Sequence, residues 1–352
     1  MSKHLHKIGT AFMSVLLASV LVACGSDGSA DTSAEPDTTE KTDTSSAPEA
    51  AEKVGFTMAM TTPGIGNAPL LAALDAMRAD GYDIEAPILA DVSLAIEGLF
   101  RGQFQFSSGS TSAALLAMAQ DAPLALIGDR SGNEWTLVTD GDIEECADLD
   151  GVQLAWHATN GSASVMTRSY IEQECPGTEP VYSVLQGSSN RATAMVAGRV
   201  DATPLELADV VALQASDAIE VNLLTSFGKA LPGVRPAAIY GNTDFMKENP
   251  QAAIDLLAAV IEQNRKVNED PDYLVEIATK YLPDYDPATI AAAAPLYVEL
   301  GVFDNDGGLT EADLQATLEF FQATEPDLAA LTADDIGDLT YIDKALERVG
   351  RA

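Results

Sequence analysis

Histidine, cysteine and positive charge are scarce in this sequence. Its 352 residues include 3 histidines and 3 cysteines, and 19 Lys plus Arg stand against 54 Asp plus Glu, a net charge of −35. A chain this acidic repels phosphate backbones, so nucleic acid is not an expected partner. His4 and His6 lie in the N-terminal segment, which leaves only His157 in the rest of the chain. We therefore predict no metal site and no cofactor.

Motifs for common catalytic chemistry are missing as well. The sequence has no Gly-x-Ser-x-Gly elbow, no phosphate-binding loop and no His-Glu-x-x-His pair. With a single histidine in the body of the chain, few side chains could act as a general base. We do not expect an enzyme.

Long apolar runs are also absent, apart from one at the N-terminus. Residues 8–22 carry no charge, but these 15 residues are fewer than the roughly 20 that a spanning helix needs. Lys3 and Lys7 precede this run, and Leu21-Val22-Ala23-Cys24-Gly25 ends it. We interpret residues 1–23 as a signal peptide with a lipobox, with Cys24 lipidated as the first mature residue. The alternative is a buried helix followed by a chance cysteine.

Residues 24–52 have the composition of a linker. Gly25 to Glu52 holds eight acidic residues and one lysine, without an aromatic or a large aliphatic residue. Such a segment cannot bury enough apolar surface to fold, so a disordered acidic linker is predicted. The remaining residues 53–352 carry 16 basic and 46 acidic residues, a net charge of −30.

Cys146 and Cys175 are the cysteines of the body of the chain. Export would place them in an oxidising compartment, where a disulfide closing a loop of about 30 residues is expected. Two independent buried thiols are the alternative.

From Val54 onward, short apolar runs alternate with helical patterns, which indicates an α/β fold. Strands are expected at 55–60, 82–88, 104–106, 124–127 and 135–138, and again at 152–156, 181–185, 200–205, 221–224 and 237–241. Helices are expected from near 68, at 92–102 and 113–120, up to about 174, at 192–198 and, at the end, at 250–267, 273–281, 287–300 and 311–321. The simplest assembly has two Rossmann-like lobes joined by crossings near 140 and 231. Lobe 1 would hold residues 53–140 and 232–352, with the helical C-terminal segment packed on it, and lobe 2 would hold residues 141–231.

Four polar loops follow predicted strands, at 61–67, 107–112, 160–164 and 186–190. They are rich in Gly, Ser, Thr and Asn, and at least three begin a helix, including one near Ala68 that Asn67 could cap. Ligands of open α/β sheets bind at the carboxyl ends of the strands, where helix-terminal amides and hydroxyls can hold an anion. Ordinary helix capping is the alternative for each single loop.

Charged and aromatic residues near these loops complete the candidate site. Arg130 could clamp an anion or pair with Asp129 or Glu134 on the surface, and Glu206 could hold an ammonium group. Arg168 and Arg191 are expected to point outward. Trp135, Trp156 and His157 could contact a ligand or serve only the core. The candidate ligand-binding residues are Thr61, Thr62, Gly66, Asn67, Ser108, Gly109, Ser110, Thr111, Arg130, Trp135, Asn160, Gly161, Ser162, Gln186, Ser188 and Glu206.

Several short pieces, in order, resemble the solute-binding proteins of ABC importers. They are Gly66-Asn67-Ala68-Pro69-Leu70, Gly81-Tyr82-Asp83-Ile84-Glu85, Gly102 to Phe106 leading into Gly109 to Ser112, Ala119 to Pro123, Asp148 to Leu154, Gly198 to Ala202, and Tyr341-Ile342-Asp343. The chain is thereby similar to the nitrate/sulfonate/taurine-type group, which has a type II periplasmic-binding fold. Two stretches depart from the pattern, namely Thr203-Pro204-Leu205-Glu206 and the polar Gly128 to Glu134.

The resemblance implies an envelope lipoprotein that captures a small anionic or zwitterionic solute between its lobes and delivers it to an ABC permease and ATPase. A monomer is expected. Alternatives are a receptor lipoprotein for a sensor system, a protein for a pyrimidine or another aromatic molecule, and a structural lipoprotein. The fold family also includes a pyrimidine-precursor synthase, but that chemistry needs a histidine donor and an iron-binding cysteine-rich segment.

Overall fold

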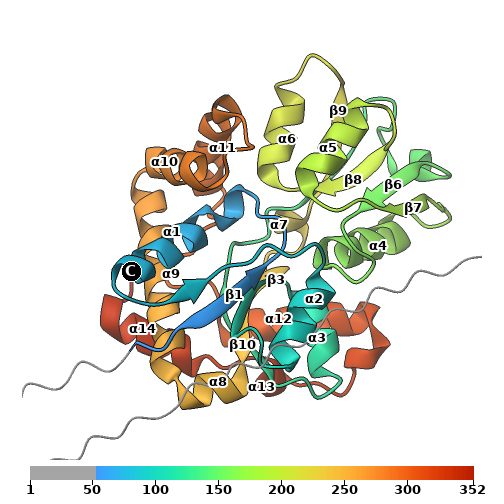
Figure 1. The fold of residues 1–352 in the computed structure, drawn as a ribbon. Coiled ribbons are helices and arrows are strands. Elements are labelled where there is room, and N and C mark those ends of the chain that lie inside the picture. The colour runs from blue at the N-terminus through green and yellow to red at the C-terminus, as the bar shows by residue number, and fades with distance from the viewer. Residues whose placement is uncertain (1–52) are drawn as a thin grey trace, which may run out of the picture. The chain divides into compact units, whose positions relative to one another are not determined.

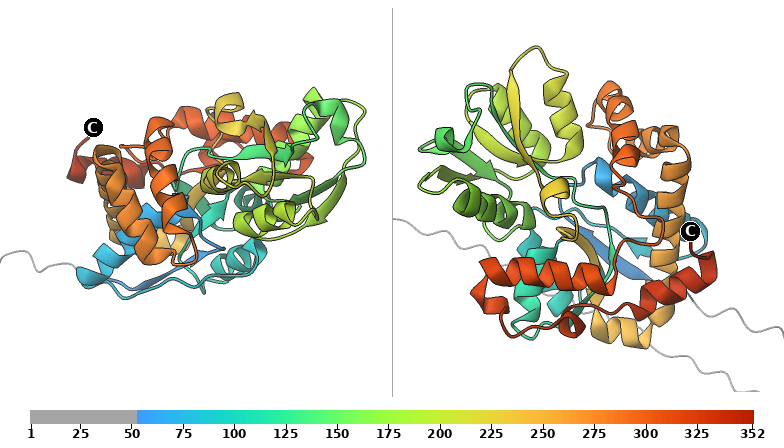
Figure 2. Two further views of the ribbon diagram at one scale, coloured as in Figure 1. Left: turned by 90° about the horizontal axis from the view of Figure 1, so that it is seen from above. Right: turned by 180° about the vertical axis from the view of Figure 1, so that it is seen from behind.

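The computed structural model describes residues 53–352. The predicted signal peptide, lipidated Cys24 and acidic linker lie outside the described residues. Two five-stranded sheets, each with flanking helices, form two spatially separate halves of the folded structure (Figures 1 and 2). The predicted two-lobed α/β fold is confirmed, and we call the halves the first and the second lobe.

The first sheet has the strand order β2-β1-β3-β10-β4. Strand β1 runs parallel to β2 and β3, whereas β10 is antiparallel to both β3 and β4. The strands are β1 (Phe56–Met60), β2 (Ile84–Glu85), β3 (Phe106–Ser110), β4 (Leu124–Asp129) and β10 (Ala237–Asn242).

The second sheet repeats this arrangement with the order β7-β6-β8-β5-β9. Strand β6 is parallel to β7 and β8, and β5 is antiparallel to β8 and β9. The strands are β5 (Thr136–Asp140), β6 (Gln153–Trp156), β7 (Val181–Val184), β8 (Ala202–Leu205) and β9 (Val221–Ser226).

Each of the two crossings between the lobes leads into an antiparallel strand, which stands fourth in the strand order of the sheet that it enters. The chain leaves the first sheet after Asp129 and enters the second with β5 at Thr136, so the first crossing lies five to ten residues before the expected position near 140. It leaves the second sheet after Ser226 and returns with β10 at Ala237. The apolar run at 135–138 does form a strand, but its lobe depends on pairing with β8 and β9, which the run itself does not reveal.

Helices fill the connections and make up most of the C-terminal segment. Those before β10 are α1 (Ala68–Ala79), α2 (Val92–Phe100), α3 (Thr111–Met118), α4 (Ser162–Glu174), α5 (Ser188–Val196), α6 (Leu207–Gln214) and α7 (Phe227–Ala230). Those after it are α8 (Thr243–Glu248), α9 (Pro250–Glu269), α10 (Pro271–Tyr281), α11 (Pro287–Glu299), α12 (Glu311–Thr324), α13 (Ala333–Ile336) and α14 (Thr340–Val349). Short 3-10 turns are η1 (Ile65–Asn67), η2 (Cys146–Leu149) and η3 (Pro326–Leu328).

The helix starts follow from local sequence. Prolines occupy the first turn of α9, α10 and α11, where the missing N–H leaves no hydrogen bond unmade. Asp286 accepts from the amide of Thr289 to cap α11, and Thr310 accepts from Asp313 to cap α12. These caps explain why the C-terminal helices lie within a few residues of their expected ranges.

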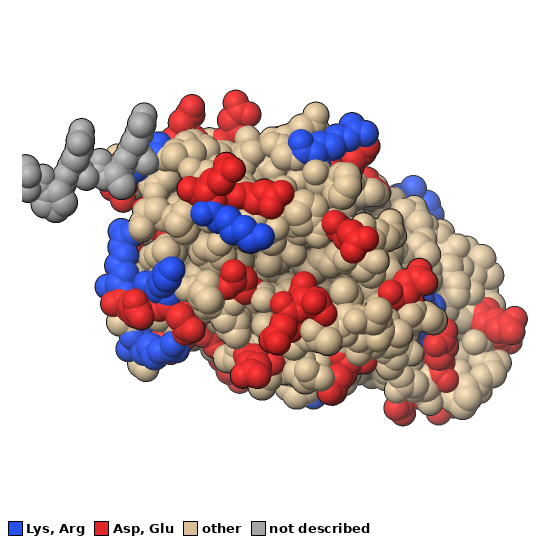
Figure 3. All heavy atoms as spheres, turned by 90° about the horizontal axis from the view of Figure 1, so that it is seen from below, with Lys and Arg blue, Asp and Glu red and all other residues tan. Residues whose placement is uncertain are grey.

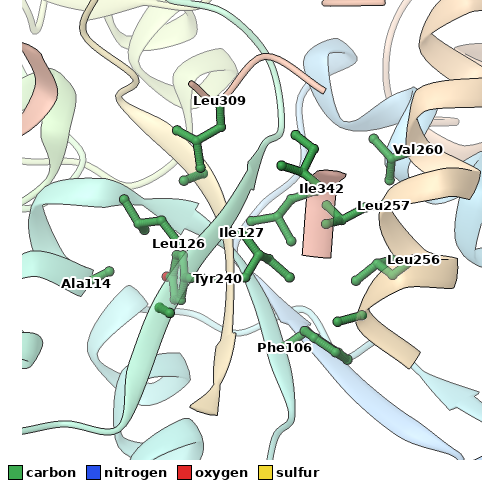
Figure 4. Packing of buried hydrophobic residues seen from close by; sticks show 14 of the residues in the cluster. Phe106, Ala114, Leu126, Ile127, Tyr240, Leu256, Leu257, Val260, Leu309 and Ile342 are labelled. Atoms are coloured by element: carbon green, nitrogen blue, oxygen red, sulfur yellow. The ribbon is translucent and has the colours of Figure 1, made fainter. Parts of the chain in front are cut away.

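The main core lies between the first sheet and the helices that cover it. Figure 4 shows Leu256 and Leu257 of α9 on the side of the sheet to which Ile127 of β4 points, whereas Tyr240 of β10 lies beside Leu126, its partner in β4, on the other side. Residues of both lobes join this cluster, including Leu137 of β5 and Phe227 of α7. Burying each large apolar side chain contributes about 1.5–3 kcal/mol, so this core fixes the strand ends that carry the site.

The C-terminal helices pack on the first lobe and also contact the second. A second apolar cluster joins Ile65 and Ala68 of the first lobe to Tyr297 of α11 and to Ala208 of α6. Helix α11 packs against α6 (Figure 1). A tail confined to the first lobe was expected, so the contact with α6 is an addition that links the lobes.

Some local predictions were wrong. The expected strand at 82–88 is continuous only over Ile84–Glu85, with a further isolated bridge from Ile88 to Met60, and Ser107 to Ser110, predicted as a loop, extend β3. The serines fit the strand because β3 is hydrogen-bonded on both sides, by β1 and β10. Helices α6, α8 and α14 and the short α7 and α13 were not predicted.

Cys146 and Cys175 form the expected disulfide. Their Cα atoms are 4.9 Å apart, and the bond joins η2 to the end of α4. Both side chains pack in a small apolar cluster with Trp156 and Leu154, so the bond belongs to the core of the second lobe.

Acidic side chains are spread over the surface, with Lys and Arg among them on the face shown in Figure 3. Many of the cations pair with carboxylates, such as Arg265 with Asp306 at 2.9 Å. None of the helices in residues 53–352 has both the length and the apolar character needed to cross a membrane.

Candidate functional site

A cavity of about 590 Å³ lies between the two lobes. Its lining includes Thr61, Ser108 and Ala237 of the first lobe and Ser162, Ser188 and Glu206 of the second. Small-molecule sites commonly occupy about 300–1,000 Å³ and lie between domains, so this cavity has the size and place of a ligand site.

The cavity lies at the carboxyl ends of parallel strands in both lobes. Residues 61–67 follow β1, and Ser110 ends β3 and caps α3. In the second lobe, residues 157–161 join β6 to α4, and residues 185–187 join β7 to α5. Residues from all four polar loops, which precede η1, α3, α4 and α5, therefore line the same cavity.

Most of the candidate residues line this cavity. They are Thr61, Thr62, Asn67, Ser108, Gly109, Ser110, Arg130, Trp135, Gly161, Ser162, Ser188 and Glu206. The others, Gly66, Thr111, Asn160 and Gln186, are not part of the lining. Gly66 and Thr111 are buried behind it, Asn160 is exposed, and Gln186 donates to Asp91 across the lobes at 3.4 Å.

Two serine hydroxyls, one from each lobe, lack hydrogen-bond partners in residues 53–352. Ser108 Oγ and Ser164 Oγ are buried, line the cavity, and make no hydrogen bond within the described chain. Ser164 lies in the first turn of α4, where the amides have no acceptor inside the helix. A buried hydroxyl without a partner costs about 1–3 kcal/mol, so both serines are candidate contacts for a molecule in the cavity.

Arg130 is buried beside Asn67 rather than paired on the surface. Its Nη1 donates to Asn67 Oδ1 at 2.5 Å, and its Nε has no partner in the described structure. Asn67 does not cap α1 as predicted, because its Oδ1 accepts from Arg130 and from the amide of Gly64. Arg130 lines the cavity and has one buried N–H without a partner among the described residues, so it stays a candidate for the anion clamp.

Glu134 lies close to Arg130, is buried, and has hydrogen-bond donors for its carboxylate within the described chain. Its carboxylate accepts a hydrogen bond from the hydroxyl of Tyr297 at 2.5 Å, and Ser131 donates at 3.5 Å. A Cβ on Gly66 would overlap Glu134 Oε1. This explains the glycine at position 66, which makes room for the carboxylate instead of contacting a ligand. Burial raises the pKa of Glu134, and the charge of Arg130 opposes that rise.

Glu206 has a different environment from Glu134. It lines the cavity with 8 % of its surface exposed, and no group of residues 53–352 donates a hydrogen bond to its carboxylate. A Cβ on Gly64 would overlap Glu206 Oε2, so the carboxylate lies directly against the 3-10 turn after β1. Burial, and next the nearby Glu134, raise the pKa of Glu206 to about 8.

Arg191 does not point outward, contrary to prediction. It is completely buried, and its guanidinium donates to Thr203 Oγ1 at 3.0 Å and to the carbonyl of Pro204 at 2.9 Å. Arg191 therefore ties α5 to β8 behind the cavity wall. Arg168 was also predicted wrongly, because it bridges the lobes to Glu325 at 2.5 Å.

The two tryptophans have separate roles. Trp135 lines the cavity, and the guanidinium carbon of Arg191 lies 5.9 Å from its ring centroid on the second-lobe side. Trp156 stacks on Tyr182 with centroids 4.3 Å apart and belongs to the core of the second lobe. Trp135 therefore stays a candidate ligand contact, and Trp156 does not.

Sequence reasoning missed part of the lining. Residues 281–285, between α10 and α11, form one wall, where Tyr285 accepts from Ser189 Oγ at 3.2 Å across the lobes. His157 also faces the cavity, and its Nδ1 accepts from the amide of Gly187 at 3.2 Å. The two tyrosines in Tyr281-Leu282-Pro283-Asp284-Tyr285 were the available signal, but this loop is more than 70 residues from the other polar loops in sequence.

Comparison with solved structures gives the fold of these lobes a wider context. A protein of Bordetella bronchiseptica RB50 is 19 % identical with a TM-score of 0.71, covering 84 % of this chain and 98 % of that one. The alkanesulfonate-binding protein SsuA from Xanthomonas axonopodis pv. citri, bound to MOPS, is 15 % identical with a TM-score of 0.60, covering 84 % and 99 %. The periplasmic nitrate-binding protein NrtA from Synechocystis PCC 6803 is 12 % identical with a TM-score of 0.65, covering 85 % and 90 %.

Sequence comparison agrees with this similarity of fold. A search of curated protein sequences finds no match. The family model described as NMT1/THI5 like matches residues 79–273, more than half of the chain. The resemblance to sulfonate- and nitrate-type solute-binding proteins, predicted from short sequence pieces, is confirmed at the level of family and fold. The chain belongs to the NMT1/THI5-like family.

Proposed function

We propose that this protein is the extracytoplasmic solute-binding component of an ABC importer and delivers a small anionic or zwitterionic molecule to a permease. The observation that carries the proposal is the cavity between the lobes, in which Ser108, Ser164 and Arg130 hold buried polar atoms without partners. Structural neighbours whose titles name alkanesulfonate and nitrate binding support it. The proposal is for binding and release, without chemical conversion.

Hinge motion about the two crossings would admit the solute. Residues 130–135 and 227–236 connect the sheets, and side chains of both lobes surround the cavity. The solute would first meet one lobe, and rotation would then bring the second lobe onto it. Closure requires that the solute bind the closed form better than the open form. We take residues 53–129 and 237–352 as one moving unit and residues 136–226 as the other.

The N-terminal segments would keep the protein at the cell envelope. Residues 1–23 would direct export, Cys24 would carry a lipid, and the acidic residues 24–52 would hold the lobes away from the bilayer as a tether. A monomer on such a tether can meet a permease and its ATPase partner in the same membrane. These assignments follow from the sequence composition and the family.

A thermal-shift screen of the full chain tests the proposal. The panel contains sulfonates, taurine, nitrate, aromatic carboxylates, pyrimidines and amino acids. A ligand at 100 times its dissociation constant adds about 2.7 kcal/mol of stability, which shifts Tm by several degrees. We expect one chemical class to raise Tm with a saturable dose dependence. If no compound of the panel raises Tm and none gives a binding signal in calorimetry, the proposal is contradicted.

A further inference from the structure

The Glu206 carboxylate is the one feature of the cavity that an anion-binding site does not explain. Glu206 is 8 % exposed, no group of residues 53–352 donates a hydrogen bond to its carboxylate, and none of the ion pairs among these residues includes it. A buried carboxylate without a donor or counter-ion costs several kcal/mol. Glu134, a few residues away in space, shows the contrasting case of a carboxylate with protein donors.

The charges around Glu206 also favour a positive partner. Arg130 and Arg191 are the buried cations near it, and Glu134, Asp209 and Glu206 are the buried acids, which leaves one acid in excess when all are ionised. Tyr285 and Tyr297 face the same region, and both stay neutral because burial raises their pKa. The charges of Arg130 and Arg191 act on Glu206, but neither guanidinium forms an ion pair with its carboxylate in residues 53–352.

The unpartnered hydroxyl groups form a second, separate group in the same cavity. Ser108 and Ser164 lie near the Ser110–Ser162 contact, while Glu206 lies against Gly64 and Ser188. One group offers donors to an acid, and the other offers an acceptor to a cation. A purely anionic solute would satisfy the first group and leave Glu206 unpaired.

Resting on the proposed function, we propose that the solute is a zwitterion whose protonated amine binds Glu206 while its acid group binds Ser108, Ser164 and Arg130. The amine supplies the missing counter-charge and hydrogen bonds, and the acid group takes the donors at the start of α4. Walls from Trp135, Tyr285 and Pro63 limit the solute to a small molecule.

Matched pairs of compounds test this assignment. Calorimetry on the full chain, purified in detergent, would compare taurine with ethanesulfonate, β-alanine with propionate, and γ-aminobutyrate with butyrate. We expect the amine-bearing member of a binding pair to bind more tightly by about 30-fold or more, because an unpaired buried charge is strongly unfavourable. Equal or tighter binding of the amine-free member would overturn the zwitterion assignment and leave the proposed function intact. If no member of any pair binds and no compound of the thermal-shift screen raises Tm, both the zwitterion assignment and the proposed function are overturned.

Variants of Glu206 test directly whether this residue causes the preference for amine-bearing compounds. Glu206→Gln keeps the shape of the side chain and removes its charge, so it should abolish the preference for the amine-bearing member. Glu97→Gln, at an exposed carboxylate, is the matched control and should preserve the preference.

The ligand-free stability of the variants gives a second readout. At pH 8.5 Glu206→Gln should melt at a higher temperature than the parent, because it removes an unpaired buried charge. Glu134→Gln should melt at a lower one, because Glu134 has protein partners. A lower melting temperature for Glu206→Gln would show that the carboxylate has a structural partner, and would overturn the inference whatever the panel shows.

Discussion

Ser110 and Ser162 join the two lobes at the edge of the cavity. Their hydroxyl oxygens are 3.1 Å apart, and the amide of Ser162 donates to Ser110 Oγ at 3.0 Å. Ser162 Oγ also accepts from the amide of Ser112 at 3.1 Å. The N-termini of α3 and α4 therefore meet through two serine side chains, which hold the two lobes in contact at this edge of the cavity.

Removing one hydroxyl of this contact should favour an open arrangement. Ser162→Ala leaves the amide of Ser112 without an acceptor, and we expect a loss of about 1 kcal/mol in the closed form. Small-angle scattering of the ligand-free protein should then report a larger radius of gyration. Ser216→Ala, at an exposed turn, is the control. Identical scattering of Ser162→Ala and parent would contradict the role of this contact in closure.

A methyl group at position 64 should block the site through Glu206. Gly64→Ala would place a Cβ on the Glu206 carboxylate, so we expect it to weaken solute binding at least tenfold and to lower Tm. The double variant Gly64→Ala/Glu206→Ala removes the overlapping atoms. Its Tm should recover relative to Gly64→Ala, and a double-mutant cycle would measure the coupling. Additive effects of the two changes would contradict the contact.

Stability should fall as pH rises toward alkaline values. In the folded protein burial raises the pKa of Glu206 to about 8, above its ordinary value of 4.5. Between these values the folded protein holds a proton that the unfolded chain has released, so stability decreases with pH, by on the order of a few kcal/mol in total. The buried acids Glu134 and Asp209 have raised pKa values for the same reason and act in the same direction.

Thermal unfolding of the ligand-free protein between pH 5.5 and 8.5 measures this effect. High salt should leave the buried contribution in place while it screens repulsion among surface acids. Glu206→Gln should melt with a weaker dependence on pH than the parent. An unchanged dependence in the variant would show that Glu206 does not titrate in this range.

Solute binding should be visible in the fluorescence of one tryptophan. The chain has two tryptophans. Trp135 lines the cavity, whereas Trp156 is stacked on Tyr182 in the core of the second lobe. A compound that binds should change the emission of the parent and of Trp156→Phe, but not of Trp135→Phe. A signal that persists in Trp135→Phe and vanishes in Trp156→Phe would place the solute elsewhere.

The disulfide should stabilise the second lobe without taking part in binding. Cys146 and Cys175 are 29 residues apart in sequence, and a loop of this size predicts a contribution of about 3 kcal/mol. Urea unfolding of Cys146→Ser/Cys175→Ser should show that loss, with solute affinity unchanged once the protein is folded. An unchanged urea midpoint would mean that the bond adds no stability.

Local sequence predicted the fold well, because strand and helix patterns with Pro, Asp and Thr signals at helix starts are short-range features. It failed where long-range pairing decides. The run at 135–138 belongs to the second sheet because β8 and β9 flank it, and Arg191 is buried because Thr203 and Pro204 of β8 lie opposite its guanidinium. Neither the pairing of this strand nor the burial of Arg191 can be predicted from the residues adjacent to it in the sequence.

The residues of the site divide in the same way, into those that local sequence predicts and those that long-range contacts bring to the cavity. Ser108, Ser162 and Ser188 were found from the polar loops that follow strands, since the carboxyl ends of parallel strands meet at one edge. Tyr285 was missed because the C-terminal helices bring it to the cavity. Gly66 was read as a ligand contact, but its neighbour is Glu134, a relationship that only the folded chain reveals.

A crystal structure of the protein with the compound that raises Tm most is the most direct test of the account. We predict that the compound lies between the lobes, with its acid group within hydrogen-bond distance of Ser108, Ser164 or Arg130 and with atoms of both lobes around it. A compound bound outside this cavity, or a cavity left empty at saturating concentration, would contradict the central claim.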